Sequence, residues 1–326
     1  MSSSASNSAF VIGVTGYMDI PAIDQPVIRE RLRTIFRWLR EPPQREGAEI
    51  EPDCESPHRE AWWPRFDAMS APGSDRHSCP SGGLGLGKQR IVLLTSLAPG
   101  ADSIAAQIAL DEGIEVVAPL PFPADSYRRS SSFCGESVEP GAQQVFDSLI
   151  ADTSHPIEAF PVLLHTDQEL DPDARGEGFR ADLDDSERCN LRYRAAGEFV
   201  ATHSHLLIAL YNADDDLSSN LETGAGTASI VHVRRSVPSV RIVPRPDEFP
   251  WTECGSVLHL CARSLKRIAD PTSIDRDTTW QDTPARFLPP YPIDVRPSLP
   301  ADAPTPREIA AAYTELQEIA RSLTGD

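Results

Sequence analysis

Three short stretches of the sequence combine glycine with hydroxyl-bearing or acidic residues at predicted turns. They are Thr15-Gly16-Tyr17, the run from Ser96 to Asp102, and the glycine-rich turn at residues 224–227. Glycine lets a backbone approach a ligand closely, and the amides at a helix N-terminus attract anionic groups such as phosphate. A single turn of this kind usually serves packing. Three of them in one chain favour a site for a nucleotide or a nucleotide-derived molecule.

Short apolar runs predict the strands that position these turns. Residues 10–15, 90–96, 114–117 and 206–210 are short and mainly apolar, which is typical of strands buried on both faces of a parallel sheet. Further strands are predicted at 160–164 and 240–243. Helices are predicted at 26–40, from the turn at Ser96–Asp102 to residue 111, at 142–150, around 191–199, at 228–235 and at 257–268. A last helix is predicted to begin at a capping box formed by Thr305 and Glu308. This alternation predicts an α/β fold, a Rossmann-like open parallel sheet with helices on both faces.

The chain is divided by segments of biased composition. Residues 41–89 are rich in proline and glycine, and they predict a long irregular insertion, partly disordered, after the first helix. Acidic residues crowd positions 166–188, which predicts a solvated loop. We therefore expect one domain over residues 1–270, followed at 271–326 by a proline-rich segment and a final helix that docks on the domain or mediates self-association.

Composition excludes several classes of function. The 326 residues carry 30 Lys and Arg against 49 Asp and Glu, a formal net charge of −19, which argues against binding a nucleic-acid polymer. The sequence contains no apolar run of transmembrane length and no signal-peptide pattern at its N-terminus, so we expect a cytoplasmic protein that does not bind membranes. The six cysteines form no Cys-x-x-Cys pair and predict free thiols.

Ligands of open parallel sheets bind beyond the carboxyl ends of the strands. Asp102 has a second interpretation as a helix cap. Tyr127 either stacks on a base, with Arg128 and Arg129 meeting phosphates, or packs beside exposed loop cations. The candidate ligand contacts are Thr15, Gly16, Tyr17, Ser96, Gly100, Ala101, Asp102, Tyr127, Gly224, Ala225, Gly226 and Thr227.

Three other patterns in the sequence do not predict a functional site. Cys54, His58, His77 and Cys79 have no common zinc-site spacing. The glycine-rich run at 81–88 ends in a lysine, but it precedes a strand instead of following one, so it predicts a flexible lead-in and no phosphate loop. Arg194 and Glu198 predict an ordinary surface ion pair at helical i, i+4 spacing. The sequence offers no evident catalytic constellation, metal site or cofactor.

The ordered set of motifs at residues 11–16, 94–102, 116–123 and 224–228 resembles the SLOG superfamily, which includes the DprA-type and LOG-type Rossmann-like domains. The resemblance covers about residues 9–16 and 90–245. It implies sensing of a nucleotide-derived signal, often in prokaryotic antiviral defence or conflict systems. It also implies a separate effector protein or ligand-driven oligomerisation.

Two departures from the family pattern bear on catalysis. LOG-type hydrolases carry Pro-Gly-Gly-x-Gly-Thr-x-x-Glu, and Ile230 stands where that glutamate belongs. A related Thr-Gly-His-Arg pattern reads Thr-Gly-Tyr17-Met18 here. An alkyl side chain cannot transfer a proton, so we expect a ligand sensor without evident catalysis. The alternatives are a nucleotide N-glycosidase that uses another carboxylate, Asp19 or Glu198, and a scaffold with a vestigial pocket.

Overall fold

The computed structural model describes residues 9–41, 84–134, 140–212, 224–236, 242–245, 248–251, 255–267, 279–283, 285–288 and 306–324. The predicted insertion therefore lies outside the described residues from 42 to 83, together with Cys54, His58, His77 and Cys79.

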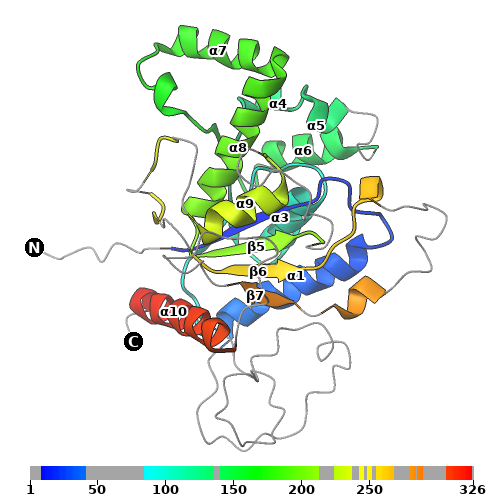
Figure 1. Ribbon diagram of the computed structural model, residues 1–326, viewed down its shortest axis with the longest axis vertical. Coiled ribbons are helices and arrows are strands. Elements are labelled where there is room, and N and C mark those ends of the chain that lie inside the picture. The colour runs from blue at the N-terminus through cyan, green and yellow to red at the C-terminus, as the bar shows by residue number, and fades with distance from the viewer. Residues whose placement is uncertain are drawn as a thin grey trace, which may run out of the picture.

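A single seven-stranded sheet forms the centre of the molecule (Figure 1). The strand order is β4-β3-β2-β1-β5-β6-β7, and every neighbouring pair is parallel except β6 and β7, which are antiparallel. The strands are β1 (Phe10–Gly16), β2 (Ile91–Leu94), β3 (Glu115–Leu120), β4 (Glu158–Pro161), β5 (Leu206–Leu210), β6 (Val257–Leu260) and β7 (Arg286–Leu288). The predicted Rossmann-like open sheet is confirmed, with β1 at its centre and the chain reversing its direction of travel between β1 and β5.

Helices cover the sheet because the strands are apolar on both faces. All residues of β2 and β5 are buried, so each face needs a layer over it. Helices α1 (Gln25–Arg40) and α3 (Ala101–Asp111) pack together, as do α8 (Ser186–Thr202) and α9 (Thr227–Arg235), and α3 and α8 both contact β1. The remaining helical elements are α4 (Ala124–Tyr127), α5 (Ser131–Cys134), α6 (Ala142–Ala151), α7 (Pro172–Asp184), α10 (Pro306–Thr324) and the 3₁₀ turns η2 (His165–Asp167), η3 (Leu265–Arg267) and η5 (Thr279–Asp282).

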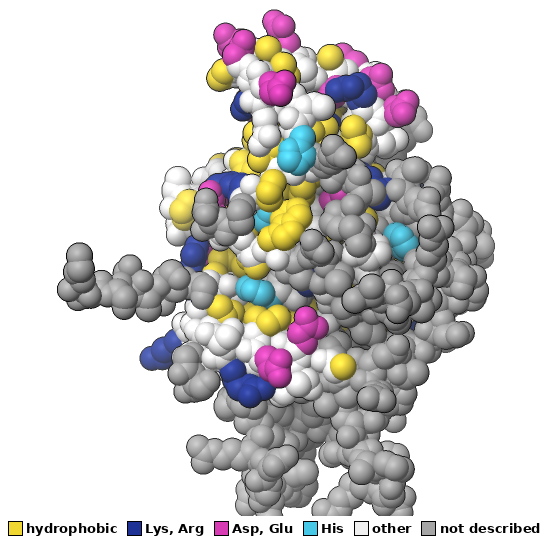
Figure 2. Space-filling view, turned by 60° about the vertical axis from the view of Figure 1, so that its left-hand side comes forward, with side chains coloured by type: hydrophobic (Ala, Val, Ile, Leu, Met, Phe, Trp, Pro, Cys, Tyr) yellow, Lys and Arg dark blue, Asp and Glu magenta, His cyan; other side chains and the backbone are white. Residues whose placement is uncertain are grey.

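The prediction of a solvated acidic loop at 166–188 is wrong, because this stretch contains α7. The Asp171 carboxylate caps α7 by accepting a hydrogen bond from the Ala174 amide. The buried Arg192 guanidinium binds Asp167 at 2.9 Å and Asp182 at 2.8 Å. These pairs tie η2 and α7 to α8, and we call residues 165–192 the α7 arm. Figure 2 shows acidic side chains gathered at its outer end, so the acidic run is largely exposed although it is helical, and Asp167 and Asp182 are its buried members.

The helix predicted at 257–268 is wrong at its start. Residues 257–260 form strand β6 in place of the start of a helix, because all four are buried between β5 and β7. Short apolar runs do not distinguish a strand from a buried helical segment. Of the strand predicted at 240–243, Ile242 makes an isolated bridge with Leu164, while residues 240 and 241 lie outside the described residues.

The glycine-rich run before β2 serves helix α1. The amides of Leu84, Leu86 and Gly87 donate hydrogen bonds to the last carbonyls of α1, at 3.0, 3.0 and 3.1 Å. These bonds satisfy acceptors that a helix C-terminus leaves without intrahelical partners. The described part of the run is thus a helix cap and neither a phosphate loop nor a flexible lead-in.

The end of the chain joins the same sheet. β7 extends it beyond β6, and α10 packs against β7 with Leu316 and Ala320 buried. Of the two roles predicted for the final helix, docking is the one that these contacts support. Within the part of the chain that the structure describes, every helix is too short or too polar to cross a membrane.

Candidate functional site

A cavity of about 510 Å³ opens at the carboxyl ends of the strands, around the point between β1 and β5 where the strand order reverses. Ligands of open α/β sheets bind in such crevices. We call it the switch-point cavity. The turns after β1, β2, β3, β5 and β6 and the middle of α8 contribute its walls. Its size falls in the range of small-molecule sites.

Ten of the twelve candidate contacts line this cavity. The turn after β1 supplies Thr15, Gly16 and Tyr17, and the turn into α9 supplies residues 224–227. The topology therefore brings together three turns that are far apart in the sequence. The ten are Thr15, Gly16, Tyr17, Ser96, Asp102, Tyr127, Gly224, Ala225, Gly226 and Thr227.

Gly100 and Ala101 do not line the cavity, and their roles are structural. Gly100 has a φ of 77°, and a Cβ at this position would lie 2.4 Å from the Tyr17 carbonyl oxygen. The Ala101 amide donates a hydrogen bond to that same oxygen at 3.0 Å. A Cβ at Gly16 would lie 2.4 Å from the Ala101 Cβ. These residues let the start of α3 press against the turn after β1.

The N-terminus of α9 presents backbone donors at the cavity. Its N-cap is Gly226, in an extended conformation, and no side chain of the described residues caps it. A Cβ built at Gly226 meets no described atom within 4 Å, so close packing does not account for the glycine. Arg194 donates a hydrogen bond to the Gly224 carbonyl at 3.1 Å and so fixes the turn to α8. The amides of the first helical turn and the helix dipole make this end suited to an anion.

Asp102 is a buried carboxyl group in the wall formed by the β2 turn, with 7% of its surface exposed. Burial raises its pKa to about 7, and the Ala98 and Ser96 amides, which favour the ionised form, only partly oppose this. It lies in the first turn of α3, but the N-cap of that helix is Gly100. A strongly shifted carboxyl in a cavity marks a candidate functional group.

Tyr127 is engaged in an aromatic cluster. Its ring meets Phe133, Phe146 and Tyr193 at centroid distances of 5.0, 5.7 and 6.1 Å, and 1% of the residue is exposed. Burial raises the pKa of Tyr127 well above its ordinary value. This packing fits the second of its two interpretations, a packing tyrosine. Arg128 pairs with Asp147 at 3.0 Å and does not line the cavity.

Asp19 and Lys266 face the cavity from the turns after β1 and β6. The Asp19 carboxylate accepts hydrogen bonds from the Ser264 hydroxyl and the Lys266 amide, all at 2.8 Å. The Lys266 side chain is exposed and is the cation of the described lining. Arg263 next to them binds the fully buried Asp24, which fixes this wall to the start of α1.

The ion pair between Arg194 and Glu198 is buried, so the prediction of a surface pair is wrong. The Arg194 Nε lies 2.9 Å from the Glu198 carboxylate, and the two side chains are 5% and 0% exposed. Both lie on the side of α8 that packs against the sheet and α9. Their i, i+4 spacing predicts the pair but not its burial. Glu198 does not line the cavity.

Ile230 lines the cavity and also packs against α8. A Cβ at Gly197 would lie 2.5 Å from the Ile230 Cδ1, so the two helices touch at this point. The residue in the position of the LOG-type glutamate therefore contributes apolar packing.

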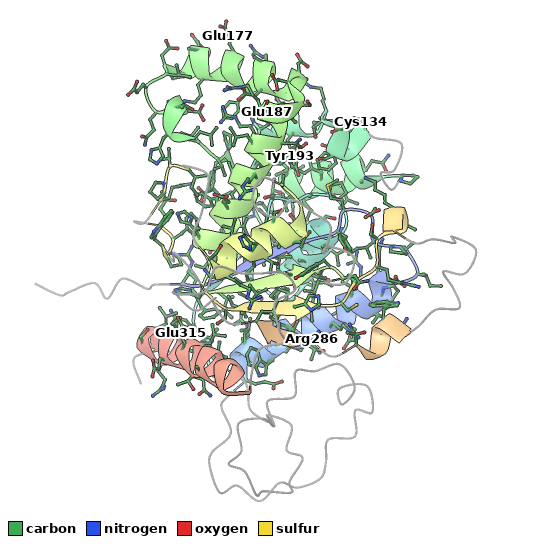
Figure 3. The ribbon with its side chains drawn as sticks, viewed as in Figure 1. Cys134, Glu177, Glu187, Tyr193, Arg286 and Glu315 are labelled. Atoms are coloured by element: carbon green, nitrogen blue, oxygen red, sulfur yellow. The ribbon has the colours of Figure 1, made fainter. Side chains whose placement is uncertain are left out.

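Several lining residues were missed because they lie on elements that the sequence places elsewhere. Tyr193 projects from the stretch of α8 between the α7 arm and the sheet (Figure 3). Its hydroxyl donates a hydrogen bond to Ser130 and accepts one from Ser132. Burial raises the pKa of Tyr193, and these hydrogen bonds partly oppose that shift. Apolar periodicity locates α8 but not its distance from the strand ends. The missed residues are Met18, Ala98, Pro121, Ser131, Ser132, Asn190, Tyr193, Ala196, Gly197, Ala228, Ser229, Ser264 and Lys266.

The comparisons with known proteins add no identification: no family model, curated protein or solved structure matches the chain. Among the described residues, no group of three His, Cys, Asp or Glu side chains is arranged to hold a metal ion.

Proposed function

We propose that the switch-point cavity binds a phosphorylated, nucleotide-derived small molecule and that the protein acts as its sensor. The observation that carries the proposal is the N-terminus of α9, which no side chain of the described residues caps, with Gly226 opening onto a cavity at the point where the strand order reverses. Backbone amides and a helix dipole at this place attract a phosphate without any cationic side chain.

The charges of the lining support a ligand with few negative charges. Its described charged groups are Lys266, Asp19 and Asp102. Two carboxyl groups repel a polyphosphate, whereas a helix N-terminus and one lysine suffice for one or two phosphate groups. This balance agrees with the net charge of −19, which disfavours a nucleic-acid polymer.

The resemblance to SLOG domains extends the proposal. In the defence systems that contain SLOG domains, the sensor passes its signal to a separate effector protein or changes its own oligomeric state. We therefore propose a place in a prokaryotic defence system.

Thermal unfolding of the purified protein tests the binding function. The panel contains AMP, ADP-ribose, cyclic ADP-ribose isomers, NAD and cyclic oligonucleotides, and each mixture is then analysed by chromatography. A ligand at 100 times its Kd adds about 2.7 kcal/mol, which raises the midpoint by several degrees. A rise with the ligand recovered intact supports a sensor. No rise with any member contradicts the proposal and favours the scaffold.

A second candidate is hydrolysis of an N-glycosidic bond, favoured by the carboxyl groups of Asp19 and Asp102 in the cavity. Glu198, the other carboxylate that the sequence suggested, lies outside the lining and is paired with Arg194. A released base in the chromatogram, absent with Asp19→Asn or Asp102→Asn, would identify the protein as this enzyme.

A further inference from the structure

The two sides of the switch-point cavity differ in chemistry. On the side of β5 and β6, the α9 N-terminus and Lys266 offer hydrogen-bond donors and positive charge. On the side of β2 and β3, the wall contains the Asp102 carboxyl with the hydroxyl-bearing Ser131 and Ser132. A ligand that satisfies both sides carries an anion at one end and neutral hydrogen-bonding groups at the other.

Asp102 is held in a fixed orientation. The Ser96 and Ala98 amides, in the loop that leads into α3, hydrogen bond to its carboxyl group, so this loop aims it. An ionised carboxylate has about four acceptor positions, more than these partners use. The exposed remnant of the side chain lies in the cavity wall. A hydrogen-bond donor of a ligand in the cavity therefore meets a carboxylate acceptor that is already oriented.

The spacing of the strands sets what Asp102 can reach. β2 and β5 flank β1, so their ends lie two strand spacings apart, about 10 Å. A phosphate at α9 occupies the β5 side of this span. In a 5′-nucleotide the sugar is joined directly to the phosphate. The length from the phosphate to a sugar hydroxyl, with one hydrogen bond to the protein added at each end, matches this span.

We propose that Asp102 is the specificity-determining residue of the cavity and accepts a hydrogen bond from a sugar hydroxyl of the bound ligand. This inference rests on the proposed function, because it needs a phosphate at the α9 N-terminus.

The inference carries a pH dependence, because only the ionised carboxyl accepts this bond fully. Burial raises the pKa of Asp102 to about 7. The apparent Kd is the intrinsic Kd divided by the competent fraction, so affinity falls about tenfold between pH 8 and pH 6. The titratable and charged groups that line the described cavity with Asp102 are Asp19 after β1, Tyr127 after β3, Tyr193 on α8 and Lys266 after β6. Tyr127 and Tyr193, whose pKa values are raised, stay neutral over this range.

Titration calorimetry with AMP, 2′-deoxy-AMP and 3′-deoxy-AMP at pH 6 and pH 8 tests the assignment. The three ligands carry the same phosphate, so ionisation of the phosphate cancels when they are compared. At pH 8 we expect one analogue to bind at least tenfold more weakly than AMP. At pH 6 this difference shrinks to about twofold or less.

Two variants repeat the test on the protein side. Asp102→Asn keeps the shape of the side chain and is expected to equalise AMP and the weaker analogue at both pH values. Asp111→Asn removes the same charge from the exposed end of α3 and is expected to leave the discrimination unchanged. The comparison of analogues on the wild-type protein stays decisive even where Asp102→Asn fails to fold.

The outcomes separate the two proposals. Equal affinity for AMP and both analogues at both pH values overturns the role of Asp102 and leaves the proposed function standing. Discrimination that survives in Asp102→Asn also overturns it. No binding of AMP at either pH overturns the role of Asp102 toward a 5′-nucleotide, and the proposed function falls with it only when no member of the thermal-unfolding panel raises the midpoint.

Discussion

Replacement of Gly226 by aspartate is expected to separate stability from binding. Gly226 is the N-cap of α9, with φ −77° and ψ 167°, a conformation that aspartate adopts readily at this position. A Cβ there meets no atom of the described chain within 4 Å. The new carboxylate caps the helix in place of an external anion, so the free energy of unfolding stays equal or rises by a few tenths of a kcal/mol.

The same change is expected to abolish binding of a phosphorylated ligand. Two unit charges about 4 Å apart at an effective dielectric constant of about 20 repel by about 4 kcal/mol. Every 1.4 kcal/mol is a factor of ten, so affinity falls roughly a thousandfold. Gly226→Asn is the matched control, because asparagine caps the helix without the charge. We expect affinity to decrease in the order Gly, Asn, Asp.

Chemical denaturation measures the stability, and titration calorimetry measures the binding of each variant. A Gly226→Asp protein that folds as stably as the wild type and still binds the phosphorylated ligand with unchanged affinity would refute the placement of the anion. Gly226→Ala is a third variant, and loss of stability in the Asp, Asn and Ala variants alike would show that Gly226 serves packing instead.

Three further predictions concern the walls of the site. Gly197→Ala pushes a methyl group into Ile230 and is expected to destabilise the fold by about 1–3 kcal/mol in denaturant unfolding, with partial rescue by Ile230→Val; additive effects would contradict the contact. Arg192→Met leaves the buried Asp167 carboxylate without its cation, while Asp182 keeps Arg188, and is expected to cost about 3–5 kcal/mol, with faster proteolysis in the α7 arm. An unchanged cleavage pattern would show that this ion pair does not hold the arm. Burial lowers the pKa of His203 to about 4 in the folded protein, so the free energy of unfolding decreases by about 3 kcal/mol as the pH falls from 7 to 4. His203→Gln is expected to remove that loss, whereas the exposed His155→Asn keeps it, and equal acid sensitivity of both variants would exclude His203 as the cause.

The central sheet could be predicted from the sequence because its strands are unambiguous. The runs at 10–15 and 206–210 are apolar and β-branched, and glycine or polar residues end them. Such runs fit strands of a sheet that is buried on both faces, and their shortness and flanking turn residues favour a strand over a buried helical segment. The carboxyl-end rule then collects the candidate turns in one crevice without any knowledge of side-chain contacts.

The parts that could not be predicted depend on tertiary contacts. Acidic composition predicts solvation at 166–188, but Arg192 provides a buried partner that lies outside that stretch. Glycine suggests a ligand contact at Gly100, although the Tyr17 carbonyl is what requires it. Tyr193 carries no sequence signal for the site, because only the position of α8 above β1 and β3 brings it there.

Hydrogen–deuterium exchange of the wild-type protein, with and without the phosphorylated ligand that raises its unfolding midpoint most, tests the central claim most directly. We predict slower exchange in peptides that cover residues 224–230 and 15–19, and none in residues 141–148, which line a separate cavity beside α6. Protection confined to residues 141–148, with none at the α9 N-terminus, would contradict the assignment of the switch-point cavity.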